Sequence, residues 1–171
     1  VILPDDLILG APGCIAEMIE AYPASGAGHL VAAMDVAPDD VSSYGVLAVT
    51  RRAGRISHAR SMVEKPKPGV APSRTAVVGR YVLDASIFDD LATQAPGAGG
   101  EVQLTDAIAR GADRLGLAGF HFSGERFDCG SKAGMLAATL RVAGADPAYA
   151  KILDSARIGP PAGSAAMLAA E

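Results

Sequence analysis

Short apolar runs alternate along this chain with segments whose apolar residues recur at helical spacing. Runs of this kind, bounded by Gly, Pro or Asp, are typical of strands, whereas the spaced pattern is typical of amphipathic helices. The predicted strands are 1–3, 29–36, 44–50, 56–63, 77–83 and 117–122. The predicted helices are 14–22, 85–92, 101–115, 131–142 and one after Pro147. Alternating strands and helices indicate an α/β fold with a mixed sheet.

Size and charge limit the classes of partner. With 171 residues, half of them apolar, the chain is long enough for one domain with a real core. Its net charge of −4 gives no electrostatic case for a nucleic acid or an anionic membrane. We therefore expect neither as a partner. A phosphorylated substrate would have to be held by a few placed cations.

The two cysteines, Cys14 and Cys129, lie far apart in the sequence. Two such thiols favour a reducing, cytoplasmic compartment. No apolar run approaches the roughly 18 residues that a membrane-spanning helix needs. The chain opens inside a predicted strand at Val1, which suggests a fragment, and residues 159–171, rich in Ala, Gly and Pro, are expected to be a mobile tail.

An acidic pair, Asp5 and Asp6, follows the first predicted strand. Ligands of α/β proteins bind outside the carboxyl ends of strands, and a carboxylate there can hold a divalent metal. On position alone, a solvated turn or a helix cap is the commoner explanation. Both interpretations stay open at this point.

A second candidate is the pair Glu64 and Lys65, at the end of a strand that Pro66 and Pro68 interrupt. Proline cannot donate to a strand ladder, so regular pairing ends here and one side chain can turn into a cleft. A sugar phosphate needs this combination, an acceptor for hydroxyls and a cation for phosphate. The alternative is an ordinary ion pair on an edge strand.

The third candidate is Asp128, before Cys129 and Gly130. An Asp in this position is more often a turn residue or a helix cap than a ligand. Cys129 has no adjacent His, which disfavours a nucleophile. The three histidines have no metal spacing and are interpreted as structural. The glycine-rich segment 97–100 has neither of the common nucleotide-binding patterns.

Taken in order, several blocks of the sequence resemble bacterial UTP–glucose-1-phosphate uridylyltransferases. The blocks are Leu3-Pro4-Asp5-Asp6, Ala16-Glu17-Met18-Ile19, Tyr44-Gly45-Val46, Val63-Glu64-Lys65-Pro66-Lys67, Val70-Ala71-Pro72-Ser73, Val78-Gly79-Arg80-Tyr81-Val82-Leu83, Pro96-Gly97-Ala98-Gly99, Glu101-Val102-Gln103-Leu104-Thr105-Asp106 and Asp128-Cys129-Gly130-Ser131-Lys132. The Glu-Lys-Pro element is shared by sugar nucleotidyltransferases in general. The resemblance extends to about Ala150.

The resemblance implies roles for individual residues. Asp5 would be catalytic and hold Mg²⁺, with Asp128 as a second metal ligand. Lys65 would be catalytic and grip the phosphate of glucose 1-phosphate. The remaining substrate-binding residues implied are Tyr44, Gly45, Glu64, Glu101 and Thr105.

The implied reaction joins UTP and glucose 1-phosphate to give UDP-glucose and pyrophosphate. The implied architecture is the mixed-sheet, Rossmann-like nucleotidyltransferase fold, with residues 1–158 as its C-terminal, sugar-phosphate-binding part. The N-terminal nucleotide-binding part, with its G-x-G-T-R loop, is absent from the sequence. We therefore expect this chain to be inactive alone, and expect full-length relatives to be homo-oligomers.

Two other functions remain open. One is a sister enzyme such as a thymidylyltransferase, since the half that would read the base is not in the sequence. The other is a non-catalytic sugar-phosphate-binding or assembly module derived from an enzyme.

Overall fold

The computed structural model describes residues 1–96 and 100–156. Its contacts divide the chain into two compact units, Val1–Arg126 and a second that begins at Phe127. Each unit is described by itself. The predicted mobile tail, 159–171, and most of the glycine-rich loop lie outside the described residues.

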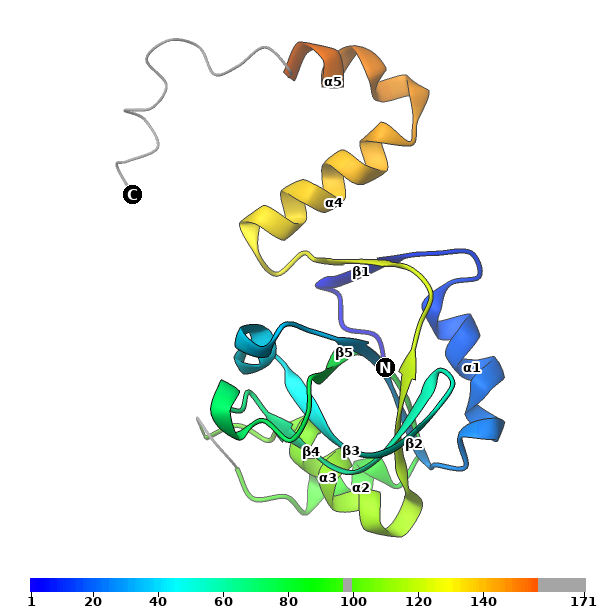
Figure 1. Cartoon of the computed structure of the whole chain (residues 1–171), viewed down its shortest axis with the longest axis vertical. Coiled ribbons are helices and arrows are strands. Elements are labelled where there is room, and N and C mark those ends of the chain that lie inside the picture. The colour runs from blue at the N-terminus through cyan, green and yellow to red at the C-terminus, as the bar shows by residue number, and fades with distance from the viewer. Residues whose placement is uncertain (97–99, 157–171) are drawn as a thin grey trace. The chain divides into compact units, whose positions relative to one another are not determined.

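Five strands of the first unit form a closed barrel in the order β2-β5-β3-β4-β6 (Figure 1). They are β2 (His29–Asp35), β3 (Gly45–Ala53), β4 (Ile56–Glu64), β5 (Thr75–Leu83) and β6 (Leu117–His121). Only β2 and β6 pair in parallel; the other neighbours are antiparallel. The predicted mixed sheet is thus present, and it closes on itself.

Three helices accompany the barrel. Helix α1 (Cys14–Ser25) packs on β2 and β5, and α3 (Leu104–Leu115) packs on β4 and beside α2 (Ile87–Ala92). Two short 3₁₀ helices, η1 (Pro38–Ser43) and η2 (Pro68–Val70), lie in the connections. The helical spacing seen in the sequence of α3 corresponds to a buried face that includes Ala107, Ile108 and Ala112.

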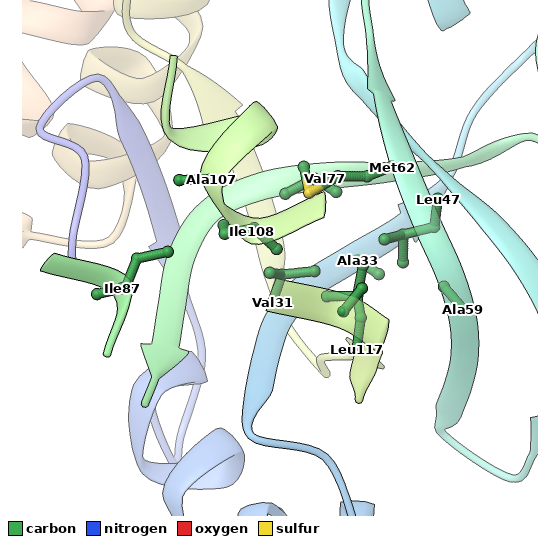
Figure 2. Close-up of a cluster of buried hydrophobic side chains, with 11 residues drawn as sticks. Val31, Ala33, Leu47, Ala59, Met62, Val77, Ile87, Ala107, Ile108 and Leu117 are labelled. Atoms are coloured by element: carbon green, nitrogen blue, oxygen red, sulfur yellow. The ribbon is translucent and has the colours of Figure 1, made fainter. Parts of the chain in front are cut away.

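Alternation along β2 creates two apolar clusters, because successive side chains point to opposite faces. Val31 and Ala33 join a cluster with Met62 and Ile108 (Figure 2). Leu30 and Ala32 join a second cluster with residues of α1. The first cluster supports the end of β4, where Glu64 and Lys65 follow Met62.

Three predictions about elements differ from the structure. The predicted helix 101–115 begins only at Leu104, so Glu101 lies before it. Residues 1–3 are not a buried strand: Val1 and Ile2 are about 60% exposed, and a single bridge joins Ile2 to Arg80. Backbone hydrogen bonds join Val1 to Tyr81 and Leu3 to Gly79, but three residues are too few for a full strand. The longer run after them makes strand β1 (Asp6–Leu9). Asp5 and Asp6 therefore stand where β1 begins.

Helix α1 also continues through Pro23 to Ser25 instead of ending at Tyr22. Proline has no backbone N–H, so Pro23 cannot donate the helical hydrogen bond to the carbonyl of Ile19, four residues earlier. Ile19 is 60% exposed, so water can replace that bond. Gly26, in the left-handed region with φ 60°, then ends the helix.

The second unit contains α4 (Lys132–Gly144), η4 (Pro147–Tyr149) and α5 (Ala150–Ala156). Ser131 begins α4 by accepting a hydrogen bond from the Gly134 N–H, an ordinary N-cap. Strand β7 (Glu125–Asp128), whose first two residues belong to the first unit, forms a two-stranded sheet with β1. Within the described ranges no helix is long and apolar enough to cross a membrane.

Candidate functional site

The antiparallel pairing of β3 and β4 brings two predicted substrate-binding segments together. Gly45 lies opposite Glu64 in the register of the two strands. One step further, the Lys65 N–H donates a 3.0 Å hydrogen bond to the carbonyl oxygen of Tyr44. Tyr44 and Gly45 therefore lie beside Glu64 and Lys65, although nearly twenty residues separate the two segments.

The carboxylate of Glu64 is held from α3. Thr105 Oγ1 donates a 2.8 Å hydrogen bond to Glu64 Oε2, while Lys65 Nζ lies 3.9 Å from Oε1. A Cβ on Gly45 would come within 3.3 Å of Oε2, closer than most real contacts. The lack of a side chain at Gly45 thus leaves room for the carboxylate and for a ligand beside it.

Lys65 has an unusual backbone conformation. Its φ of 43° places it in the left-handed region, which no other non-glycine residue among those described occupies. This conformation costs an L-residue roughly 1–2 kcal/mol, and such residues concentrate at functional sites. It breaks the alternation of β4, and the Lys65 side chain is 64% exposed.

A cavity of about 590 Å³ opens beside these residues. Its lining includes Glu64, Lys65, Gln103 and Asp106. Glu101, another predicted contact, accepts a 3.2 Å hydrogen bond from Gln103 Nε2. The volume is in the range of pockets that hold small ligands, and the lining combines one ammonium group with carboxylates and an amide.

The two adjacent aspartates have different environments. Asp6 is buried: Oδ1 accepts from Arg126 Nε at 2.5 Å and Oδ2 accepts from the Gly79 N–H at 2.8 Å. A Cβ on Gly79 would lie 2.7 Å from that oxygen, so only glycine allows this approach. Asp5 is exposed. Asp6 is thus committed to the fold, and Asp5 is the carboxylate accessible to a metal.

Arg126 links Asp6 to Tyr44, which with Gly45 forms the predicted sugar-side segment. Its Nη1 donates a 3.1 Å hydrogen bond to the Tyr44 hydroxyl, and the guanidinium lies 5.4 Å from the centre of the Tyr44 ring. Burial alone would lower the pKa of Arg126, but the hydrogen bond and the charge of Asp6 outweigh it and raise that pKa. Arg126 is therefore a permanent cation here.

The pKa of the Tyr81 phenol is affected by burial and by nearby carboxylates. Burial first, and then the charges of Asp6, Glu64 and Asp5, raise the pKa of its phenol to about 12. Coulombic effects weaken with distance, so the three carboxylates share the surroundings of one ring. The hydrogen bonds of Arg126 to Asp6 and to Tyr44 place the acidic segment, Asp5 and Asp6, and the sugar-side segment, Tyr44 and Gly45, in one neighbourhood.

Asp128 belongs to the second unit. Its Oδ1 accepts from the Gly130 N–H at 3.1 Å, and its carbonyl accepts from Ser131 Oγ at 3.1 Å. These contacts are those of a turn residue at the start of α4. The pairing of Asp5 with Asp128 around a metal stays a prediction. Within the part of the chain that the structure describes, no three His, Cys, Asp or Glu residues gather into a metal-binding group.

Sequence reasoning did not identify Arg126 as part of the site. Asp6 and Tyr81 stood in the matched blocks without an assigned role. Arg126 lies 120 residues from Asp6 along the chain and has no local motif of its own. The sequence shows only that a charged residue precedes Phe127, and this is too general a feature to predict the partner of Arg126.

Comparisons with known proteins identify the family. The family model for nucleotidyl transferases matches residues 1–143. The chain belongs to the nucleotidyl transferase family. UTP–glucose-1-phosphate uridylyltransferase of Komagataeibacter xylinus is 42% identical over 132 residues, covering 77% of this chain and 46% of the relative. The enzyme of the same name from Pseudomonas aeruginosa is 40% identical, covering 81% of this chain and 50% of the relative.

The fold of this chain is similar to solved structures of UDP-glucose pyrophosphorylases. A UDP-glucose pyrophosphorylase complexed with UDP-glucose superposes with a TM-score of 0.80 at 36% identity, covering 85% of this chain and 56% of that one. The UTP-bound enzyme of Acinetobacter baumannii gives 0.76 at 34% identity, covering 91% and 54%. The predicted mixed α/β nucleotidyltransferase fold is confirmed. This nucleotidyl transferase chain spans about half the length of its relatives, and its assignment to their C-terminal part stays a prediction.

Proposed function

We propose that this chain is the glucose-1-phosphate-binding part of a UTP–glucose-1-phosphate uridylyltransferase. The observation that carries the proposal is that Glu64 and Lys65 line one cavity and that Tyr44, Gly45 and Thr105 lie directly beside these two residues. The free thiols support work in the reducing cytoplasm. The resemblance to full-length enzymes extends the proposal to a homo-oligomer.

In this proposal the sugar is bound by the β3–β4 segment. The Glu64 carboxylate accepts hydrogen bonds from ring hydroxyls, in the direction that Thr105 gives it. Gly45 lets the ring approach the backbone, because no Cβ stands in the way. The Lys65 ammonium, exposed at the rim, neutralises the phosphate. The chain thereby holds the sugar and its charge together.

The reaction is an in-line displacement at phosphorus. An oxygen of glucose 1-phosphate forms a bond to the α-phosphorus of UTP, and the bond from that phosphorus to the bridging oxygen breaks. Pyrophosphate leaves with the electron pair. Such a transfer depends on positioning and on neutralising charge, and this is the work that Lys65 and Glu64 would do.

Mg²⁺ is the metal that the proposal implies. It binds one or two carboxylates and takes its other ligands from water and substrate phosphates, so a cage of several side chains is not needed. Asp5, exposed beside the committed Asp6, fits the first ligand, and we propose Asp128 as the second. When bound, the metal neutralises phosphate charge.

A thymidylyltransferase is the alternative enzyme. The putative glucose-1-phosphate thymidylyltransferase of Bacillus anthracis superposes with a TM-score of 0.63 at 27% identity, below the values for the UDP-glucose pyrophosphorylases. This difference favours the uridylyl function.

Calorimetry tests the proposal. Glucose 1-phosphate, UDP-glucose and dTDP-glucose are titrated into the 171-residue chain and into Lys65→Ala. Loss of a hydrogen bond between charged groups should weaken binding about 10- to 100-fold. Lys67→Ala, an exposed lysine two residues away, is the matched control and should bind normally. Absence of glucose 1-phosphate binding, or equal binding by Lys65→Ala, contradicts the proposed site.

A further inference from the structure

We infer that Arg126 is a positioning residue, which keeps the acidic and the sugar-side segments of the site in register. The inference rests on the proposed function, because it concerns the same glucose 1-phosphate site. Arg126 itself is mostly buried, with 15% of its side chain exposed, and acts through two neighbours. One neighbour is Asp6 and the other is Tyr44.

The contact with Asp6 fixes the start of β1. Arg126 Nε holds one carboxylate oxygen at 2.5 Å, while the Gly79 N–H holds the other. Arg80 Nη2 also donates to the backbone carbonyl of Asp6. With its side chain and its carbonyl both held, Asp6 has little freedom. Asp5, the residue before it, therefore starts from a fixed backbone position.

The contact with Tyr44 fixes the other segment. Arg126 Nη1 donates to the Tyr44 hydroxyl, and the Tyr44 carbonyl accepts from the Lys65 N–H. Tyr44 is thereby held at both ends, between Arg126 and the residue proposed to bind phosphate. Gly45 follows it directly. A displaced Tyr44 would move the backbone against which the sugar lies.

Packing does not replace this hydrogen bond. A cavity of about 550 Å³ borders Tyr44 and Arg126, and its lining includes Asp40 and His121. The tyrosine ring therefore has open space beside it, and the guanidinium limits its movement. A planar guanidinium donates in two fixed directions, whereas an ammonium is a point charge. Lysine at position 126 could keep the ion pair with Asp6 without also reaching Tyr44.

Two variants separate positioning from simple stabilisation. Arg126→Lys should keep most of the thermal stability, because a cation still faces Asp6. It should nevertheless weaken glucose 1-phosphate binding about 10- to 100-fold, the range seen in metal sites when a hydrogen bond that orients a ligand residue is lost. Tyr44→Phe removes only the hydroxyl and should weaken binding in the same direction. The double variant should bind no worse than Arg126→Lys, because both substitutions remove the same hydrogen bond, the one between Arg126 and the Tyr44 hydroxyl.

The measurements are calorimetry with glucose 1-phosphate and thermal unfolding, both on the 171-residue chain. Arg74→Lys, at an exposed arginine, is the matched control and should bind normally. If the unaltered chain binds and both Arg126→Lys and Tyr44→Phe bind equally well, the positioning role is overturned and the proposed function stands. If the unaltered chain does not bind, both proposals fall.

Discussion

Thr105, in the first turn of α3, donates a 2.8 Å hydrogen bond to the carboxylate of Glu64, at the end of β4. The two residues are 41 positions apart in the sequence. The bond uses one carboxylate oxygen and leaves the other, Oε1, beside Lys65. A direct contact of Thr105 with substrate stays a prediction, and its hydroxyl is placed to orient Glu64, another predicted substrate-binding residue.

Thr105→Val should therefore weaken glucose 1-phosphate binding without unfolding the protein. Valine has nearly the shape of threonine but no donor, and a typical hydrogen bond of about 1 kcal/mol corresponds to roughly a 5-fold loss of affinity. Calorimetry measures the loss. Thr139→Val, at an exposed threonine of α4, is the matched control. Equal affinity for Thr105→Val would show that Glu64 needs no support from α3.

Gly45→Ala tests the close approach of the β3 backbone. The new methyl group would lie 3.3 Å from both Glu64 Oε2 and Met62 Cε, so the carboxylate must shift by tenths of an ångström. We expect roughly a 10-fold loss of glucose 1-phosphate affinity, less than the ~100-fold that a 1 Å misplacement can cost. At Gly69 a Cβ would meet nothing within 4 Å. Gly69→Ala should bind normally, and a similar loss in both variants would refute the steric argument.

Local periodicity was sufficient to predict most elements of the barrel. The apolar run of β2 and the alternation of β4 lie where expected, and β4 ends at Glu64, before the prolines. Pattern identifies the face that a strand buries, but not the strand that pairs with it. The parallel pairing of β2 with β6 joins residues nearly 90 positions apart, and no local signal encodes the closure.

The arrangement of the candidate site could be predicted in part, and for the same reason, while the roles of its residues stay predictions. Glu64, Lys65, Tyr44 and Gly45 stand in short recognisable blocks, and an antiparallel register brings them together. The roles of Asp6 and Arg126 depend on one contact between distant segments. Two adjacent aspartates look equivalent in a sequence, and the contacts of Asp6 with Arg126 and with the Gly79 N–H distinguish them in the structure.

The two thiols should react at very different rates. Burial raises the pKa of Cys14 to about 11, and the side chain is 4% exposed, so it has little thiolate at neutral pH. Cys129 is partly exposed. Ellman's reagent at pH 8 should label one thiol quickly and the second only after unfolding. Cys129→Ser should remove the fast phase and Cys14→Ser should keep it. Simultaneous labelling of both thiols in the native protein would contradict this.

Stability should fall as the pH falls below about 6.5. Burial lowers the pKa of His29 from 6.5, although the nearby Asp84 and Asp90 oppose it. The folded state thus favours the neutral ring, and the unfolded state binds the extra proton, so this contribution is complete above pH 6.5 and is lost below it. Urea titrations at pH 7 and pH 5 measure the change.

His29→Leu should reduce this pH dependence without abolishing it, because burial also lowers the pKa of His121. A His29→Leu protein whose midpoint changes with pH as much as that of the unaltered chain would exclude His29 as a source. His121→Gln, measured in parallel, gives the second contribution.

Asp5 and Asp6 should fail in different assays. Asp6→Asn removes the carboxylate charge that faces the mostly buried guanidinium of Arg126, which should cost about 3 kcal/mol in the free energy of unfolding. Asp5→Asn alters an exposed side chain and should leave thermal unfolding unchanged. It should instead remove the gain in UDP-glucose affinity that Mg²⁺ gives over EDTA, measured by calorimetry. Mg²⁺-dependent binding that persists in Asp5→Asn would place the metal elsewhere, because Asp6 has both carboxylate oxygens engaged by the fold.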